Sequence, residues 1–152
     1  MDSHGYVETL AHRLLQLGIV LFLIGLLTGF VAPTLTNPRM GLASHLEGIL
    51  NGLFLVLLGL VWKQLSLSRI TLVTTFWLAV YGTFANWAGT LLGAFWGASA
   101  FMPIAAAGHY ASVAKEAVIS ALLVTLSLAM VTVCILVLWG LRAGATRLDG
   151  AA

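Results

Sequence analysis

Long apolar stretches alternate with short polar segments along the chain, and this pattern predicts helices that cross a membrane. A hydrocarbon core of about 30 Å requires about 20 apolar residues in a helix. Stretches of suitable length run over about residues 14–32, 45–62, 70–97 and 117–141. We therefore predict an all-α protein, an integral membrane four-helix transmembrane bundle that forms a single membrane domain over residues 1–152.

The composition supports lipid as the solvent of this fold. Apolar residues make up 61% of the chain and charged residues 8%, whereas about 25% of an average soluble domain is charged. The net charge of +2 is too small to indicate nucleic-acid binding. Because the chain holds 1 cysteine, an intrachain disulfide and a multi-cysteine metal site are excluded.

The positive residues predict an orientation in the membrane. With four spans, both termini and the linker over residues 63–69 share one side. That side carries five of the 7 Lys and Arg residues, namely Arg13, Lys63, Arg69, Arg142 and Arg147. The other side carries Arg39 and Lys115. Cytoplasmic loops are enriched in Lys and Arg, so we expect cytoplasmic termini.

Glycines four residues apart indicate close helix packing, because small residues allow backbones to approach in lipid. The pairs Gly25/Gly29 and Gly48/Gly52 fit this spacing, although single pairs also arise by chance. Glycines 89, 93 and 97 form a longer series, and for them we predict a packing seam on the third helix.

Polar side chains inside two of the predicted spans are the candidates for function, since such groups are costly in lipid. They are His45, Glu47 and Asn51 on the second helix, and Thr83, Asn86 and Thr90 on the third. Glu47 and Asn51 are four residues apart and share a face, whereas His45 lies about 120° away from Asn51. A ligand that touches all of these would lie across the helix end or between subunits.

Each candidate also has a purely structural interpretation. Ser44 and Glu47 have the spacing of a capping box at a helix start. His45 lies where an interfacial histidine is simply hydrated, and Asn51 and Asn86 have the character of interhelical hydrogen-bonding residues.

A second set of polar residues belongs to the same end of the bundle. Lys115 and Glu116 are expected as solvated residues at a helix start, where Glu116 also favours the helix dipole. His109 lies in a linker and is either solvated or a second ligand.

No soluble-enzyme motif occurs in the chain: there is no phosphate-binding glycine loop, no GxSxG, no HExxH and no CxxC. A metal bound by protein alone needs more ligands than the chain supplies at close spacing. A haem needs only one or two protein ligands, so a single intramembrane histidine points to haem.

Residues 37–42 (NPRMGL), 45–48 (HLEG) and 51–52 (NG) resemble the membrane hydroxylaminobenzene mutases of nitroarene-degrading bacteria. The resemblance covers most of the chain, and it extends more distantly to the styrene oxide isomerases. Those isomerases are four-helix membrane enzymes with haem b between the subunits of a trimer. Their haem-ligating histidine, followed by asparagine six residues later, is matched by His45 and Asn51. Their Ala-Asn pair is matched by Ala85 and Asn86.

The chain departs from the isomerases at Thr90, where they carry a tyrosine, and this puts an epoxide substrate in doubt. The resemblance implies an isomerase of the bacterial inner membrane that converts an aryl hydroxylamine, such as hydroxylaminobenzene, to 2-aminophenol. It implies His45 as axial ligand of haem b, with Asn51 and Asn86 orienting the substrate. Glu47 is a candidate proton shuttle, and Thr83 and Thr90 are expected to line the pocket.

Three other functions stay open. A non-catalytic membrane haem protein or electron-carrier subunit would use two axial ligands, with His109 as the second. An epoxide isomerase and a small transporter are the other two. Transporters commonly place a charge deep within a span, whereas the charges here lie at helix ends.

Overall fold

The computed structural model describes residues 3–98 and 100–149, with the side chains of 5–98 and 100–143. Four long helices carry the fold: α1 (Ser3–Val31), α2 (Pro38–Val61), α3 (Arg69–Trp96) and α5 (Val113–Asp149). Three short helical segments join them: η1 (Ala32–Thr34), η2 (Trp62–Gln64) and α4 (Pro103–Ala106). The described residues contain no strand, so the predicted all-α class is confirmed.

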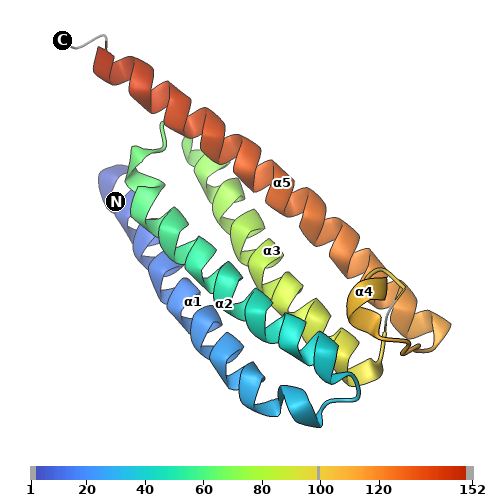
Figure 1. The fold of residues 1–152 in the computed structure, drawn as a ribbon. Helices are drawn as coiled ribbons and strands as arrows, with labels where there is room; N and C mark the ends of the chain where they lie inside the picture. The colour runs from blue at the N-terminus through green and yellow to red at the C-terminus, as the bar shows by residue number, and fades with distance from the viewer. Residues whose placement is uncertain (1–2, 99, 150–152) are drawn as a thin grey trace.

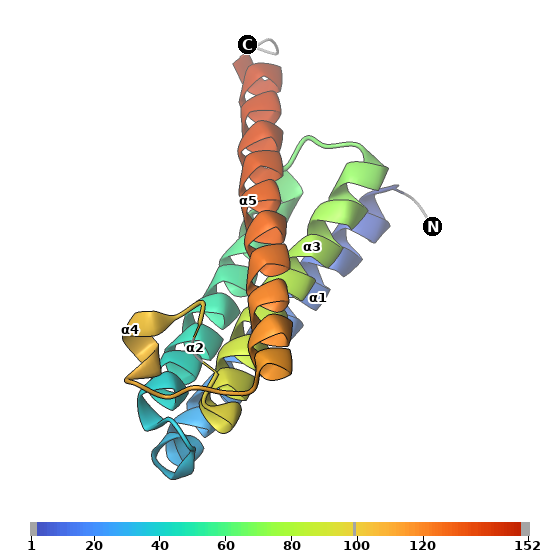
Figure 2. The ribbon, with the colours of Figure 1, turned by 90° about the vertical axis from the view of Figure 1, so that its right-hand side faces the viewer.

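The long helices run up and down, and neighbours in sequence are neighbours in space (Figure 1). Both ends of the chain and the α2–α3 linker lie at one end, whereas the α1–α2 turn and α4 lie at the other. α5 packs along α3 and against η2, and no described residue of α5 reaches contact distance of α1 or α2. The helices therefore form an open row in the order α1, α2, α3, α5 rather than a closed square. Within it α1 also touches α3, and α4 lies beside α2 (Figure 2).

Three of the helical segments are both long and apolar enough to cross a membrane: Gly5–Thr34, Pro38–Gln64 and Val113–Ala143. The sequence prediction named four such helices. α3 has a similar length of 28 residues and is not one of the three; threonine and asparagine side chains interrupt its apolar sequence. It lies between α2 and α5 and packs against both.

The start of α2 differs from the prediction. The helix begins at Pro38 rather than near His45, because the Asn37 side chain caps it by accepting a hydrogen bond from the Met40 amide at 3.0 Å. The capping box predicted for Ser44 and Glu47 is therefore wrong. Ser44 lies inside the helix, and its hydroxyl donates to the Trp87 carbonyl at 3.1 Å.

The remaining boundaries lie close to the prediction or extend it. α3 begins and ends within one residue of the expected range, whereas α1 and α5 continue past the apolar stretches into polar sequence. Helices commonly continue beyond the hydrocarbon layer, so apolar length underestimates them.

The close glycine packing lies between α1 and α2. A Cβ on Gly25 would lie 2.7 Å from the Gly48 carbonyl carbon, and one on Gly18 would lie 2.7 Å from the Gly52 carbonyl oxygen. Of the seam predicted for residues 89, 93 and 97, only Gly89 packs closely, since a Cβ there would lie 3.2 Å from Leu122 Cδ2 of α5. A Cβ on Gly93 would meet nothing closer than 3.5 Å, and Gly97 ends α3 with a φ of 70°.

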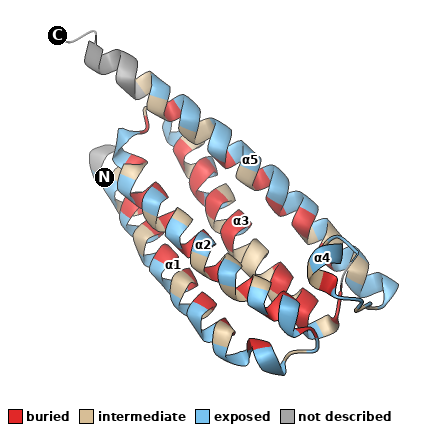
Figure 3. Cartoon of the chain, viewed as in Figure 1, coloured by how far each residue is buried: buried red, intermediate tan, exposed pale blue. Residues whose placement is uncertain are grey.

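Most buried side chains lie where α1, α2 and α3 meet, and the outer face of α5 is largely exposed (Figure 3). The main apolar cluster includes Leu14, Leu21, Leu55, Trp62 and Phe76. A smaller cluster joins Ala98 to Ile119, Leu123 and Leu126 of α5. Exposed leucines line the outside of the helices, as expected where lipid replaces water.

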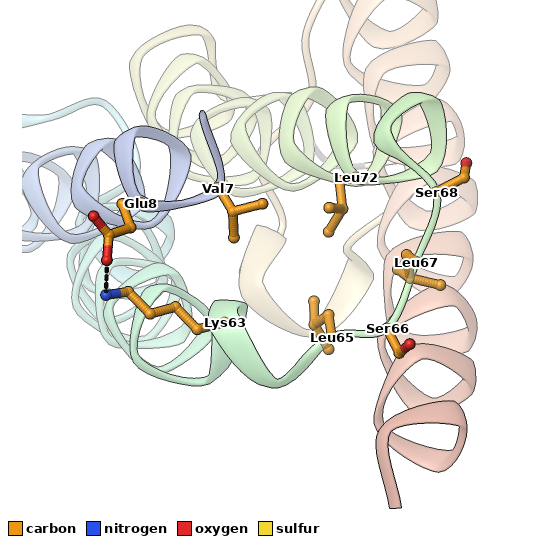
Figure 4. A pocket seen from close by; sticks show the side chains of 8 residues that line it. All are labelled: Val7, Glu8, Lys63, Leu65, Ser66, Leu67, Ser68 and Leu72. Atoms are coloured by element: carbon orange, nitrogen blue, oxygen red, sulfur yellow. Dashed lines mark hydrogen bonds and ion pairs between the residues drawn. The ribbon is translucent and has the colours of Figure 1, made fainter. Parts of the chain in front are cut away.

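A cavity of about 480 Å³ lies at the end that carries the termini (Figure 4). Glu8 and Lys63 form an ion pair of 2.7 Å at its edge, which ties α1 to η2. Both side chains are more than half exposed, so the pair contributes little stability. The residues that the sequence singled out for function lie toward the other end, and none of them lines this cavity.

Candidate functional site

A carboxyl group held by two amides forms the centre of the candidate site. The Asn86 side-chain amide of α3 donates to Glu47 Oε2 at 2.6 Å, and the Asn51 amide donates to the same oxygen at 3.0 Å. Asn51 also donates to the Glu47 backbone carbonyl at 2.9 Å. Asn51 is buried, whereas Glu47 and Asn86 are half-buried. These contacts place Glu47 at the edge between α2 and α3.

The two asparagines hold the carboxyl group in different ways. Asn86 bonds between helices, as the structural interpretation proposed, whereas the bonds of Asn51 stay within α2. Both amides use Oε2, and among the described hydrogen bonds none reaches Oε1. The carboxyl group is thus fixed in place while one oxygen stays available for a proton or a ligand.

His45 lies on the opposite edge of the same helix. Its Nδ1 is 2.8 Å from the Gly25 carbonyl oxygen of α1. A carbonyl only accepts, so Nδ1 carries the proton and, in a neutral imidazole, Nε2 keeps its lone pair. This contact replaces the interpretation of a simply hydrated histidine. The predicted divergence of His45 from Glu47 and Asn51 is confirmed, since one faces α1 and the others face α3.

The two threonines of the predicted α3 stripe are buried but do not reach Glu47. The Thr83 hydroxyl donates to the Ala79 carbonyl at 2.8 Å, and the Thr90 hydroxyl donates to the Asn86 carbonyl at 2.9 Å. Both hydroxyls therefore bond to their own helix, as threonine often does in lipid. Their role as a pocket wall stays a prediction.

Glu116 forms a separate structural cluster. Its carboxylate accepts from the Ala100 amide at 2.8 Å and from the Ala111 amide at 3.1 Å, which anchors the linker before α5. Glu116 is half-exposed, so the prediction of a solvated residue holds only in part, while its place in the first turn of α5 agrees with the predicted interaction with the helix dipole. Lys115 is exposed and lies 5.6 Å from the centre of the Trp96 ring. His109 is half-buried in the same linker, with its backbone amide bonded to the Ala106 carbonyl.

Two further residues connect the elements around the site, and these contacts were not predicted from the sequence. The Trp87 indole of α3 donates to the Thr28 hydroxyl of α1 at 3.0 Å, one residue along from Asn86. Asn37 is fully buried, and its amide donates to the Ala105 and Ala106 carbonyls at 3.0 and 2.9 Å. The Asn37-Pro38 pair was a signal for the cap, whereas nothing in the sequence marked the partners of Trp87.

An apolar cavity of about 450 Å³ adjoins these residues, between α2 and the segment that contains α4. Its walls include Leu42, Ala43 and Leu46 of α2, together with Arg39. Leu46 stands between His45 and Glu47 in the sequence. The cavity therefore borders the exposed strip of α2, formed by Leu42 and Leu46, that lies between the edge with His45 and the edge with Glu47.

The described side chains do not suit a bare metal ion. Within residues 5–98 and 100–143, no three His, Cys, Asp or Glu side chains gather in a way that could hold one. A haem places a smaller demand on the protein, because the porphyrin supplies most of the ligands. His45 fits that demand, since Gly25 engages Nδ1 and leaves Nε2 for an iron.

The chain is similar to known proteins over most of its length. A family model described as styrene oxide isomerase matches residues 10–142. Hydroxylaminobenzene mutase HabB of Ectopseudomonas oleovorans is 59% identical over 139 residues, which cover 91% of this chain and 85% of the relative. Hydroxylaminobenzene mutase HabA of the same organism is 48% identical over 125 residues, covering 82% and 93%. No solved structure gives a significant match.

Proposed function

Because the chain belongs to the styrene oxide isomerase family and is an isomerase, we propose that it converts an aryl hydroxylamine, such as hydroxylaminobenzene, to 2-aminophenol. The names of the two mutase relatives support this substrate class. Within the structure, the proposal is carried by one observation: α2 presents an imidazole nitrogen on one edge and a fixed carboxyl group on the other.

The reaction defines what the residues must do. The nitrogen–oxygen bond breaks and a carbon–oxygen bond forms at the ortho position, with no net oxidation or reduction. The ortho carbon loses a proton and the nitrogen gains one. The site therefore needs a group that takes up a proton and returns it, and an environment that keeps water away from the electron-poor ring.

Glu47 is suited to the proton transfer. Its position is fixed by Asn51 and Asn86 through Oε2, so Oε1 is the oxygen that accepts the ring proton and delivers it to nitrogen. Both N–H groups of the Asn51 amide already bond to Glu47, whereas Asn86 uses only one of its two, so the second Asn86 N–H and the side-chain carbonyl oxygens of both asparagines can orient the hydroxylamine group once the substrate is bound. The apolar cavity beside Leu46 suits the aromatic ring, and Arg39 in its lining is consistent with an opening near the membrane surface.

Haem b is the cofactor that we propose for this site. His45 would hold it through Nε2, with the tautomer set by the Gly25 carbonyl. When bound, the haem iron supplies a Lewis acid that weakens the nitrogen–oxygen bond. Thr90 stands where the styrene oxide isomerases carry a tyrosine, and this difference favours a hydroxylamine over an epoxide as substrate.

The open row of helices supports a membrane-embedded homo-oligomer. We propose that α3 crosses the membrane together with α1, α2 and α5, giving four spans in a bacterial inner membrane with cytoplasmic termini. α3 is shielded from lipid on two sides by α2 and α5, which allows its polar residues. The exposed strip of α2 between His45 and Glu47 is not covered by α5, so a second copy completes the site; a trimer follows the family resemblance.

The activity test is direct. Purified protein given hydroxylaminobenzene without any reductant or oxidant should release 2-aminophenol, measured by chromatography. Retention of substrate, or formation of aniline instead, contradicts the proposal. The oxygen of substrate labelled with ¹⁸O should remain in the product, because the transfer is intramolecular.

The cofactor test compares two histidines. His45→Ala should reduce the haem content of the purified protein at least about 10-fold, as expected when a metal site loses its ligand. His12 is exposed on α1, so His12→Ala should leave the haem content unchanged. Full haem content in His45→Ala rules out the ligand assignment. A bis-histidine visible spectrum that is lost in His109→Ala supports the electron-carrier alternative.

A further inference from the structure

Gly29 of α1 faces the ring of His45 so closely that a side chain at position 29 would require the ring to move. A Cβ at position 29 would lie 2.7 Å from His45 Nδ1, 2.9 Å from Cε1 and 3.3 Å from Cγ. All three of its nearest atoms belong to the same imidazole. Gly29 has ordinary helical geometry, so the requirement for glycine at this position is one of space.

The other packing glycines of α1 meet different atoms. A Cβ on Gly25 or Gly18 would collide mainly with the backbone of α2, so these residues set how closely the two helices approach. Only at Gly29 does the His45 side chain occupy the space. Gly25 and Gly29 are one helical turn apart, and the ring rests against both: Gly25 accepts its hydrogen bond and Gly29 makes room for it.

We propose that Gly29 is a positioning residue that seats the His45 imidazole on α1. The seat holds Nδ1 at 2.8 Å from the Gly25 carbonyl and thereby leaves Nε2 as the unprotonated nitrogen, on the side of the ring away from that carbonyl. The use of Nε2 as a haem ligand rests on the proposed function. The positioning of the ring by Gly29 does not rest on the proposed function, because it is defined by the contacts between α1 and α2.

The test is a double-mutant cycle on thermal unfolding of the full chain in detergent. Gly29→Ala in the native background should lower the Tm by about 5 °C or more, because the methyl group displaces the ring. In the His45→Ala background the ring is absent, and Gly29→Ala should leave the Tm unchanged or raise it through better helix propensity. Gly93→Ala is the matched control, since its Cβ meets no atom within 3.5 Å.

If Gly29→Ala lowers the Tm equally in both backgrounds, the proposal is wrong, because the His45→Ala background contains no ring to displace. Failure of Gly29→Ala to fold in both backgrounds contradicts it for the same reason. Failure of Gly29→Ala alone, rescued by His45→Ala, supports it. ¹⁵N spectra of labelled histidine in the haem-free native protein provide a second readout. The Nδ1–H tautomer is expected at His45, and the Nε2–H tautomer overturns the proposal.

Haem binding separates this inference from the proposed function. If the native protein binds haem, Gly29→Ala should weaken its retention at least about 10-fold while Gly93→Ala leaves it unchanged. If the native protein binds no haem, the cofactor proposal fails. The double-mutant cycle and the tautomer then still decide whether Gly29 seats the ring.

Discussion

At the scale of single residues, Glu47 has a structural role in the hydrogen bonds that it accepts, and the proposed function gives it a chemical role as well. Its Oε2 accepts hydrogen bonds from the side-chain amides of Asn51 and Asn86. Asn51 also donates to the Glu47 backbone carbonyl, and these are the described acceptors of the two amides. Buried amide donors that lose an acceptor cost about 1–3 kcal/mol each, so the group cannot be deleted without consequence. A substitution that keeps the shape of the side chain but removes the oxygen proposed to transfer the proton therefore tests the structural role and the chemical role separately.

Glu47→Gln should retain the stability of the native protein and lose its turnover. The glutamine carbonyl accepts both asparagine amides, so the Tm should stay close to the native value. Without a titrating group, kcat should fall by about 10²–10⁴-fold with a smaller change in KM. Glu47→Ala should lose activity and also unfold at lower temperature. Turnover of Glu47→Gln at the native rate would remove Glu47 from the chemistry.

The residue contacts were predictable only in part. Glu47 and Asn51 are four apart in one helix, so their contact follows from spacing alone. The bond from Asn86 depends on how α3 is rotated and shifted along α2, which packing decides and a single sequence does not reveal. For the same reason the contact of Gly29 with His45 was not predicted, although both residues were noted in the sequence for other reasons.

At the scale of the elements, Asn37 connects the start of α2 to two later segments. Its Oδ1 caps α2, its backbone amide donates to the Ala94 carbonyl at 3.0 Å, and its Nδ2 donates to two carbonyls of α4. The apolar pattern located the helices because lipid demands apolar length. It missed the first turns of α2, which carry Arg39 and depend on the cap rather than on hydropathy.

Asn37→Ala should destabilise the protein by about 2 kcal/mol or more, since a lost N-cap alone costs about 1 kcal/mol and the α4 carbonyls lose their donor. Asn37→Ser keeps a side-chain oxygen that can cap the helix and removes the amide donor without placing a charge beside the α4 carbonyls, so it should be intermediate. Thermal unfolding of the three proteins gives the order. If Asn37→Ser is as unstable as Asn37→Ala, the cap contributes little and the hydrogen bonds to α4 dominate.

At the scale of the whole molecule, the helices form a row in which α5 is held mainly by α3. The α2–α3 linker supports it further, because the Ser66 amide donates to the Gly140 carbonyl at 3.0 Å. Helix number and order were predictable, but the row was not, since apolar surfaces facing lipid and facing protein have the same composition. The polar character of α3 is consistent with its place between two neighbours.

The orientation of the row can be measured with reporter fusions. Green fluorescent protein fused to the C-terminus should fluoresce, because that end carries the excess of Lys and Arg and should remain cytoplasmic. Alkaline phosphatase fused after Gly108, in the linker at the opposite end, should be active. Active phosphatase at the C-terminus would invert the topology and place Arg39 in the cytoplasm.

The contacts of Asn37 also bear on how the chain is assembled as it is synthesised. The α1–α2 hairpin can form as soon as α2 leaves the ribosome, but the acceptors for the Asn37 amide lie 68 and 69 residues further along. Until that part of the chain has been translated, the turn lacks its last two bonds. The hairpin that carries His45 and Glu47 is therefore locked only after α3 and α4 have been synthesised and packed beside it.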